Sequence, residues 1–100
     1  MSQEEIISKI KEAMMSAPNR EHIQSIYLFG SFLHGNAKEN SDIDLLFEMN
    51  KTLSLFKIFD TQYYLEKKLR RKVDFIEKNS LDKYIKDEIF AEARKIYGKK

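Results

Sequence analysis

The sequence predicts a small α/β domain over residues 1–100, in which helices flank a three-stranded mixed sheet in the order α-β-α-β-α-β-α. Segments with apolar residues at helical spacing alternate along the chain with short apolar runs that are typical of buried strands. The composition, 42% hydrophobic and 34% charged residues, is that of a globular protein and not of a disordered one. A chain of 100 residues can build one hydrophobic core, so a single domain is expected.

Local signals predict the first helix and the first strand. Ser2 and Glu5 form a capping-box pattern, and the apolar residues that follow at helical spacing predict a helix over 3–16. Pro18 ends this helix. A buried strand is expected over 23–29, which closes on four consecutive apolar residues.

The middle of the chain predicts a turn between two neighbouring strands. A turn and a short helix are expected over 31–35, and the polar segment 36–41 is expected to be a loop. The second strand is expected over 42–49, with apolar residues on both faces, which indicates that both faces are covered. Because the connection is short, the first two strands should be neighbours and antiparallel.

A long helix, a third strand and a last helix complete the prediction. A helix over 53–71 leads to a strand over 73–77, and this crossover should bring the third strand beside the second. The last helix is expected to begin with Ser80 as its N-cap, to continue through Ile96 and to stop at Gly98.

The long helix carries a broader apolar surface than one contact with a sheet needs. Two interpretations remain open: the surface packs into the small core, or part of it meets a partner chain. The residues are Leu55, Phe56, Ile58, Phe59, Tyr63, Tyr64, Leu65 and Leu69.

Asp42 and Asp44 stand two positions apart at the start of the second strand. Side chains at i and i+2 of a strand point to the same face, so both carboxylates should project together. Neighbouring carboxylates repel each other, and a bound divalent cation removes that conflict. Oxygen ligands alone favour magnesium.

Gly30 and Ser31 follow the first strand and predict a phosphate-binding turn. Glycine allows the backbone to approach a ligand closely, and free N–H groups at the start of a helix favour an anion. The Ser31 hydroxyl can donate one more hydrogen bond. A phosphate-binding turn beside a pair of metal-binding carboxylates indicates a nucleotide site.

Gly30-Ser31, ten further residues and then Asp42-x-Asp44 resemble the signature of the DNA polymerase beta-like nucleotidyltransferases. The likeness is greatest to the minimal nucleotidyltransferase (MNT) antitoxins, which pair with HEPN toxins. The likeness extends over 23–76 and includes the Val73-Asp74 segment. It implies that Asp74 is the third carboxylate of the metal site and not an incidental acid in a strand.

The resemblance implies a small polymerase beta-like nucleotidyltransferase fold and a protein adenylyltransferase that moves AMP from ATP. The acceptor would be the hydroxyl of a tyrosine in a HEPN toxin. Toxin and antitoxin would form a hetero-oligomer. Two Mg²⁺ ions would assist. The implied catalytic and metal-binding residues are Asp42, Asp44 and Asp74, and the implied nucleotide-binding residues are Gly30, Ser31, His34, Gly35 and Ser41.

One position departs from the family pattern. Many relatives have arginine or lysine where this chain has His34, and a neutral imidazole compensates triphosphate charge poorly. Nucleotide affinity could therefore be weaker or pH-dependent; the alternative is that His34 is only an exposed loop residue.

Two other functions remain open at this stage. The chain could be a module that neutralises a partner by contact alone, or a nucleotidyltransferase that acts on small molecules, as the aminoglycoside-modifying enzymes do. Intact Ser31, Asp42, Asp44 and Asp74 argue against the first function. The second is disfavoured because 100 residues leave no room for an acceptor-binding domain.

Charge and composition point to the cytoplasm and away from nucleic acid. The chain has no cysteine, a polar N-terminal segment unlike a secretory signal, and no apolar run of membrane-spanning length. The net charge of +2 is small, so no stable nucleic-acid binding is expected. The most basic segment, 67–72, suits a helix C-terminus better than a nucleic-acid surface.

Overall fold

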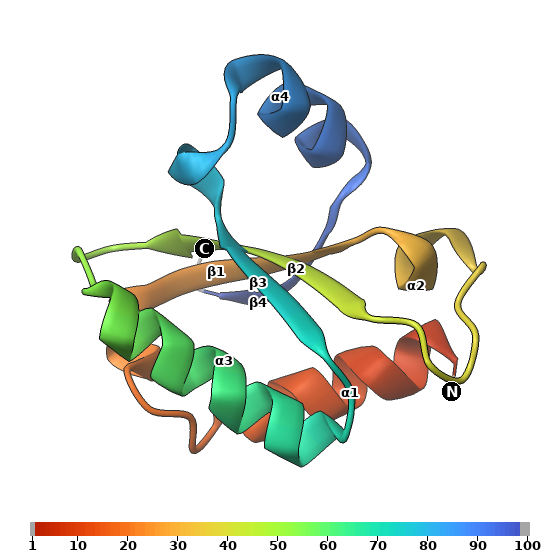
Figure 1. The fold of residues 1–100 in the computed structure, drawn as a ribbon, viewed down its shortest axis with the longest axis horizontal. Helices are drawn as coiled ribbons and strands as arrows, with labels where there is room; N and C mark the ends of the chain where they lie inside the picture. The colour runs from red at the N-terminus through yellow and green to blue at the C-terminus, as the bar shows by residue number, and fades with distance from the viewer. Residues whose placement is uncertain (1, 99–100) are drawn as a thin grey trace.

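The structure is a computed structural model that describes residues 2–98 (Figure 1). Its helices are α1 (Gln3–Met14), α2 (Ser31–His34), α3 (Leu55–Leu69) and α4 (Lys83–Glu92). Its strands are β1 (Ile23–Phe29), β2 (Ile43–Met49), β3 (Val73–Glu77) and β4 (Arg94–Gly98). Two 3₁₀ turns, Arg20–His22 and Lys78–Ser80, precede β1 and α4. No helix within residues 2–98 combines the length and the apolar character needed to cross a membrane.

The strands form one mixed sheet in the order β3-β2-β1-β4. β1 pairs antiparallel with β2 and with β4, whereas β2 and β3 pair in parallel. The predicted antiparallel pairing of the first two strands and the crossover that places the third beside the second are therefore confirmed. Figure 1 shows α1 and α3 against one face of the sheet and α4 over the other.

The prediction of three strands is wrong, because the C-terminal segment adds a fourth. The last helix ends at Glu92, and Ala93 already has extended dihedrals (φ −62°, ψ 142°). The chain then pairs along the edge of β1, where Ile96 is buried in the core. Ile96 follows Ile89 at helical spacing, but an edge of β1 that would otherwise be unpaired competes for the same residues. The predicted stop at Gly98 is therefore the end of a strand.

Capping side chains explain where the helices begin. Ser2 and Glu5 form the predicted capping box at α1, with hydrogen bonds of 3.2 Å in both directions. At α4 the predicted N-cap Ser80 is wrong: its hydroxyl donates to the Glu77 carbonyl at 2.7 Å within the 3₁₀ turn. Asp82 is the cap instead, and its carboxylate accepts from the Tyr84 N–H at 2.8 Å.

The core lies between the sheet and the two helices α1 and α3. Alternate residues of β2, namely Ile43, Leu45 and Phe47, point to this layer and are fully buried. The rings of Phe47 and Phe75 stack with centroids 4.1 Å apart. This layer supplies most of the buried apolar area, and burial of apolar area stabilises the fold.

α3 turns only part of its apolar surface to that core. Its buried residues are Thr61, Leu65 and Leu69, whereas Phe56, Phe59 and Tyr63 are 82%, 57% and 59% exposed. The core interpretation therefore fails for the outer side of this helix. We call Leu55, Phe56, Phe59 and Tyr63 the outer face of α3.

Candidate functional site

Three strands bring the candidate residues to one end of the sheet. Phe29 of β1 lies opposite Asp44 of β2, and Asp44 in turn lies opposite Asp74 of β3. Residues in register across neighbouring strands share a face, so both carboxylates project from the face that α1 and α3 leave free. Gly30 follows Phe29 directly, which places the predicted phosphate-binding turn at the same end.

Asp44 and Asp74 form a close acidic pair. The pKa of Asp44 is raised to about 6, first because the carboxyl is partly buried, then through a hydrogen bond and charge repulsion from Asp74, and last through the charge of Asp42. Two carboxyl groups joined by a hydrogen bond resist double ionisation, and they share a proton or a cation. The Asp44–Asp74 pair is therefore suited to bind a cation.

Asp42 lies one position before β2 and is half-buried. Its charge acts on Asp44, but within residues 2–98 no three histidine or acidic side chains converge closely enough to enclose a metal ion as they stand. The chemistry of Asp44 and Asp74 nevertheless fits a divalent cation. Bound positive charge would offset the repulsion between the two carboxylates and lower the raised pKa of Asp44. These two residues would hold Mg²⁺, with Asp42 within electrostatic range.

Gly30 is required by the position of Asp44. A Cβ atom at residue 30 would lie 2.9 Å from Cγ of Asp44, which is closer than real Cβ atoms approach. The backbone at Gly30 also has φ +77° and ψ −151°, a conformation that is essentially restricted to glycine. The turn therefore packs directly on the acidic pair, as the sequence motif predicts.

Ser31, Gly35 and Ser41 differ in how well their positions fit the predicted role. Ser31 begins α2, and its hydroxyl makes no hydrogen bond to any residue that the structure describes. Gly35 ends α2 with φ +76° and has open space around its Cα, so a helix C-cap explains it. The Ser41 hydroxyl accepts from the Lys38 N–H at 2.7 Å and closes the loop before Asp42.

His34 faces an acid of α4. Its Nε2 atom lies 3.0 Å from Oε2 of Glu92, and the two side chains are 49% and 65% exposed. Gly30, His34, Glu88 and Glu92 line the same small hollow. A protonated His34 therefore already has an anionic partner in the structure.

Two residues that support the site were not found from the sequence. Arg71 donates to the carbonyls of Lys38 and Ser41 at 3.2 and 3.1 Å, and it stacks over the ring of Phe32 at 5.1 Å. It thus holds the loop before Asp42, although its basic segment predicts only a helix end. Gln3 donates to the carbonyls of α2, and no sequence signal marks this long-range contact.

A polar cluster fastens the 3₁₀ turn and α4 to the face that carries the acids. Lys78 Nζ lies 3.2 Å from Glu48 Oε2 and 4.1 Å from the centroid of Phe90. Tyr27 donates to Glu48 at 3.1 Å, and its ring centroid lies 4.6 Å from that of Phe90. Burial alone would raise the pKa of Glu48, but hydrogen bonds from Ser25, Lys78 and Tyr27 outweigh it and hold the pKa below its usual value.

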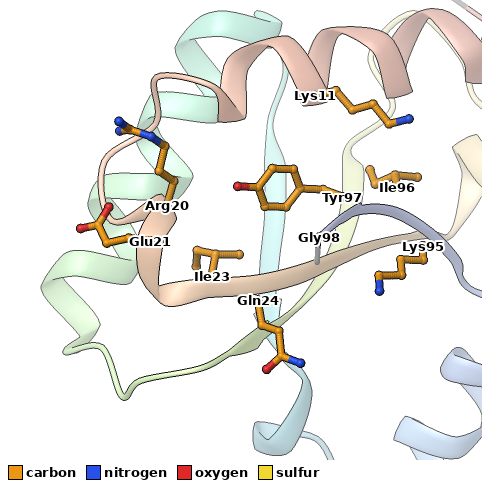
Figure 2. A pocket seen from close by; sticks show the side chains of 9 residues that line it. All are labelled: Lys11, Arg20, Glu21, Ile23, Gln24, Lys95, Ile96, Tyr97 and Gly98. Carbon is orange, nitrogen blue, oxygen red and sulfur yellow. The ribbon is translucent and has the colours of Figure 1, made fainter. Parts of the chain in front are cut away.

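A hollow larger than the one beside His34 lies elsewhere, at the edge formed by β4 (Figure 2). It measures about 780 Å³ and contains none of the candidate residues. Figure 2 shows the Tyr97 ring between Lys11 and Arg20, on the side of the sheet that α1 covers. Size therefore does not identify the site here; the acidic pair does.

Comparison with known proteins assigns the chain to a family. The polymerase beta nucleotidyltransferase family matches residues 8–100. The chain belongs to this family. The protein adenylyltransferase MntA of Thermococcus cleftensis is 37% identical over 78 residues, which cover 78% of this chain and 79% of that protein. MJ1215 of Methanocaldococcus jannaschii, named as a candidate protein adenylyltransferase, is 40% identical over 79 residues, with 75% and 92% covered.

Solved structures of nucleotidyltransferases share the fold. A candidate minimal nucleotidyltransferase superposes with a TM-score of 0.77 at 28% identity, with 93% of this chain and 94% of that chain covered. A toxin–antitoxin complex with AMP-PNP also gives 0.77, at 24% identity, with 94% and 74% covered, and at this identity the likeness concerns the fold alone. The predicted membership among the minimal nucleotidyltransferases, their fold and the enzyme class are confirmed.

Proposed function

We propose that this nucleotidyltransferase moves AMP from ATP to a hydroxyl of a partner protein, a tyrosine of a HEPN toxin, and so acts as an antitoxin. The observation that carries the proposal is the acidic pair Asp44–Asp74 packed against the Gly30 turn. The name of the MntA relative supports a protein as the acceptor. Structures of the same fold include an MntA–HepT toxin–antitoxin complex and an AMPylated HEPN toxin bound to its MNT antitoxin.

The residues divide the reaction between phosphate binding and charge compensation. The Ser31 hydroxyl and the turn at Gly30 would bind the outer phosphates of ATP. Asp44 and Asp74, with Asp42 beside them, would hold Mg²⁺, which compensates the triphosphate charge and lowers the pKa of the acceptor hydroxyl.

The transfer itself is an in-line displacement. The hydroxyl oxygen attacks the α-phosphorus, the bond to the bridging oxygen breaks, and pyrophosphate leaves. Asp74, the more exposed member of the pair, would accept the hydroxyl proton. Positioning and charge stabilisation then supply most of the reduction in the barrier.

The outer face of α3 supports a protein partner. Four large apolar side chains on one side of a helix form an exposed patch of the kind that interfaces cover. The patch belongs to the layer opposite the acidic pair (Figure 1). Contact with the partner and transfer to it would therefore use different surfaces of this chain, as in a hetero-oligomer in which binding and catalysis can be separated.

The test is to weigh the partner toxin by intact mass spectrometry after incubation with ATP and Mg²⁺. The wild-type protein is expected to produce an AMP-sized mass increase, whereas Asp44→Asn should produce none while still binding the toxin. Asp87→Asn, the same substitution at an exposed position of α4 outside the proposed contact surface, serves as the matched control and should behave as wild type.

Two outcomes contradict the proposal. No adduct with the wild-type protein, together with full neutralisation of the toxin by both proteins, would indicate a module that acts by contact alone. Transfer to a small hydroxyl compound but not to the toxin would indicate a small-molecule enzyme.

A further inference from the structure

The junction between α4 and β4 holds the short helix α2 from two sides. Glu92 and Arg94 stand two positions apart at this junction. Glu92 pairs with His34 at the end of α2, whereas Arg94 reaches α2 indirectly, through Gln3 of α1. Both contacts meet the helix that begins directly after Gly30.

Gln3 makes hydrogen bonds with both ends of its amide. Its Nε2 atom donates to the carbonyls of Phe32 at 3.1 Å and Leu33 at 2.9 Å. Its Oε1 atom accepts from Nη1 of Arg94 at 2.7 Å. Only one orientation of the amide satisfies these contacts, because a flipped amide would set oxygen against two carbonyls and NH₂ against a guanidinium. Arg94 therefore determines the orientation in which Gln3 binds α2.

α2 needs such support because it is short. A helix of four residues makes too few internal hydrogen bonds to persist alone, and its last carbonyls have no partner within the helix. Gln3 satisfies two of these carbonyls. Gln3 is itself held in place by the capping box of Ser2 and Glu5, and Arg94 is held by a second contact, 2.8 Å to Glu4.

We propose that Gln3 and Arg94 are positioning residues for the nucleotide: they fix α2 so that the Gly30–Ser31 turn presents its hydrogen-bond donors to the phosphates. This inference rests on the proposed function. Neither residue touches the acidic pair, whose members belong to β2 and β3. Loss of either contact should therefore weaken nucleotide binding while metal binding stays unchanged.

The test compares the affinities of the full chain for Mg–AMP-PNP and for Mn²⁺ alone, both by calorimetry. Gln3→Leu removes the donors without adding charge, and Gln24→Leu is the matched control at an exposed position of β1. We expect Gln3→Leu to weaken Mg–AMP-PNP binding about tenfold and to leave Mn²⁺ binding as in wild type. Arg94→Leu should show the same split, and Arg94→Lys should recover part of the affinity.

The possible failures are distinguishable. Unchanged Mg–AMP-PNP affinity in Gln3→Leu, or an equal loss in Gln24→Leu, would overturn the positioning role while the proposed function stands. A parallel loss of Mn²⁺ binding in Gln3→Leu would also overturn it, because the substitution would then disturb the acidic pair and the rest of the fold as well as α2. Absence of Mg–AMP-PNP binding to the wild-type protein would contradict the proposed function itself.

Discussion

The two faces of the sheet serve different ends, although the same strands form both. Toward α1 and α3, β2 presents Ile43, Leu45 and Phe47, which are fully buried and apolar. Toward α4, the same strand presents Asp44 and Glu48, which take part in an acidic pair and a polar cluster. Apart from Leu46, which is fully buried on the same face as Asp44, the apolar and the acidic residues of β2 thus lie on opposite faces. A substitution at Leu45 or at Asp44 should therefore affect mainly one of the two properties, stability or chemistry.

The largest expected effect concerns the apolar face. Leu45→Ala removes a fully buried side chain and leaves a cavity, so the free energy of unfolding should fall by about 2–5 kcal/mol. Urea denaturation measures this loss. Because Leu45 points away from the acids, the transfer rate of the molecules that remain folded should match wild type. A large loss of rate per folded molecule would show that the faces are not independent.

The second effect concerns the contact between the turn and the acidic pair. Gly30→Ala would force its methyl group against the Asp44 carboxyl and strain the backbone, at a cost of about 1–3 kcal/mol. Gly30→Ala should also lose the transfer of AMP. Gly35→Ala is the matched control, since Gly35 also has positive φ but open space around it. Thermal unfolding of both variants should place Gly30→Ala lower; equal losses would mean that positive φ alone explains Gly30.

The third effect is a pH dependence that belongs to the acidic face. The pKa of Asp44 is about 6 in the folded protein and near 3.8 when unfolded, so the folded state binds this proton more tightly. The contribution to stability is therefore complete below pH 4 and is lost as the pH rises through 6. Since the carboxyl is partly exposed, the loss should be only about 1 kcal/mol.

This dependence is measured by urea denaturation in a chelator between pH 4 and 7, as the difference between wild type and Asp44→Asn. The subtraction removes the opposite contribution of Glu48, whose pKa is lowered. Relative to Asp44→Asn, the wild type should lose stability as the pH rises from 4 to 7, and Mg²⁺ should oppose this loss because it binds the ionised pair. A wild type that gains stability relative to Asp44→Asn over the same rise in pH would contradict the assigned sign.

The smallest effect on stability is expected on the outer face of α3. Phe56→Ser and Phe59→Ser replace exposed rings, so the free energy of unfolding should change by no more than about 0.5 kcal/mol. Binding to the partner should nevertheless weaken, as a pull-down with the toxin would show. Unchanged binding in the double variant would remove this surface from the proposal.

Local signals predicted most of the fold. The capping box, the bounds of β1 and β3 and the parallel crossover all follow from patterns within a few residues or from the length of a connection. β4 was missed because Ile96 continues a helical pattern, and only the unpaired edge of β1, far away in the sequence, decides against the helix.

The site was predictable only in part, for the same reason. Gly30, Asp42 and Asp44 belong to one short motif, so they could be found together. Gln3 and Arg71 could not, because their contacts join residues about 30 positions apart through ordinary polar groups. The sequence shows which residues carry chemistry, but not which ones hold them in place.

The proposed role of Gln3 and Arg94 has a consequence for the order in which a newly made chain gains its binding sites. Gln3 and Arg94 are separated by 91 positions, so the hydrogen bond between them needs almost the whole described chain. β1 and β2 can pair much earlier during synthesis, and β3 completes the acidic pair next. Nascent chains that stop before β4 should therefore bind a metal ion before they bind a nucleotide well, and synthesis of β4 would complete the nucleotide site.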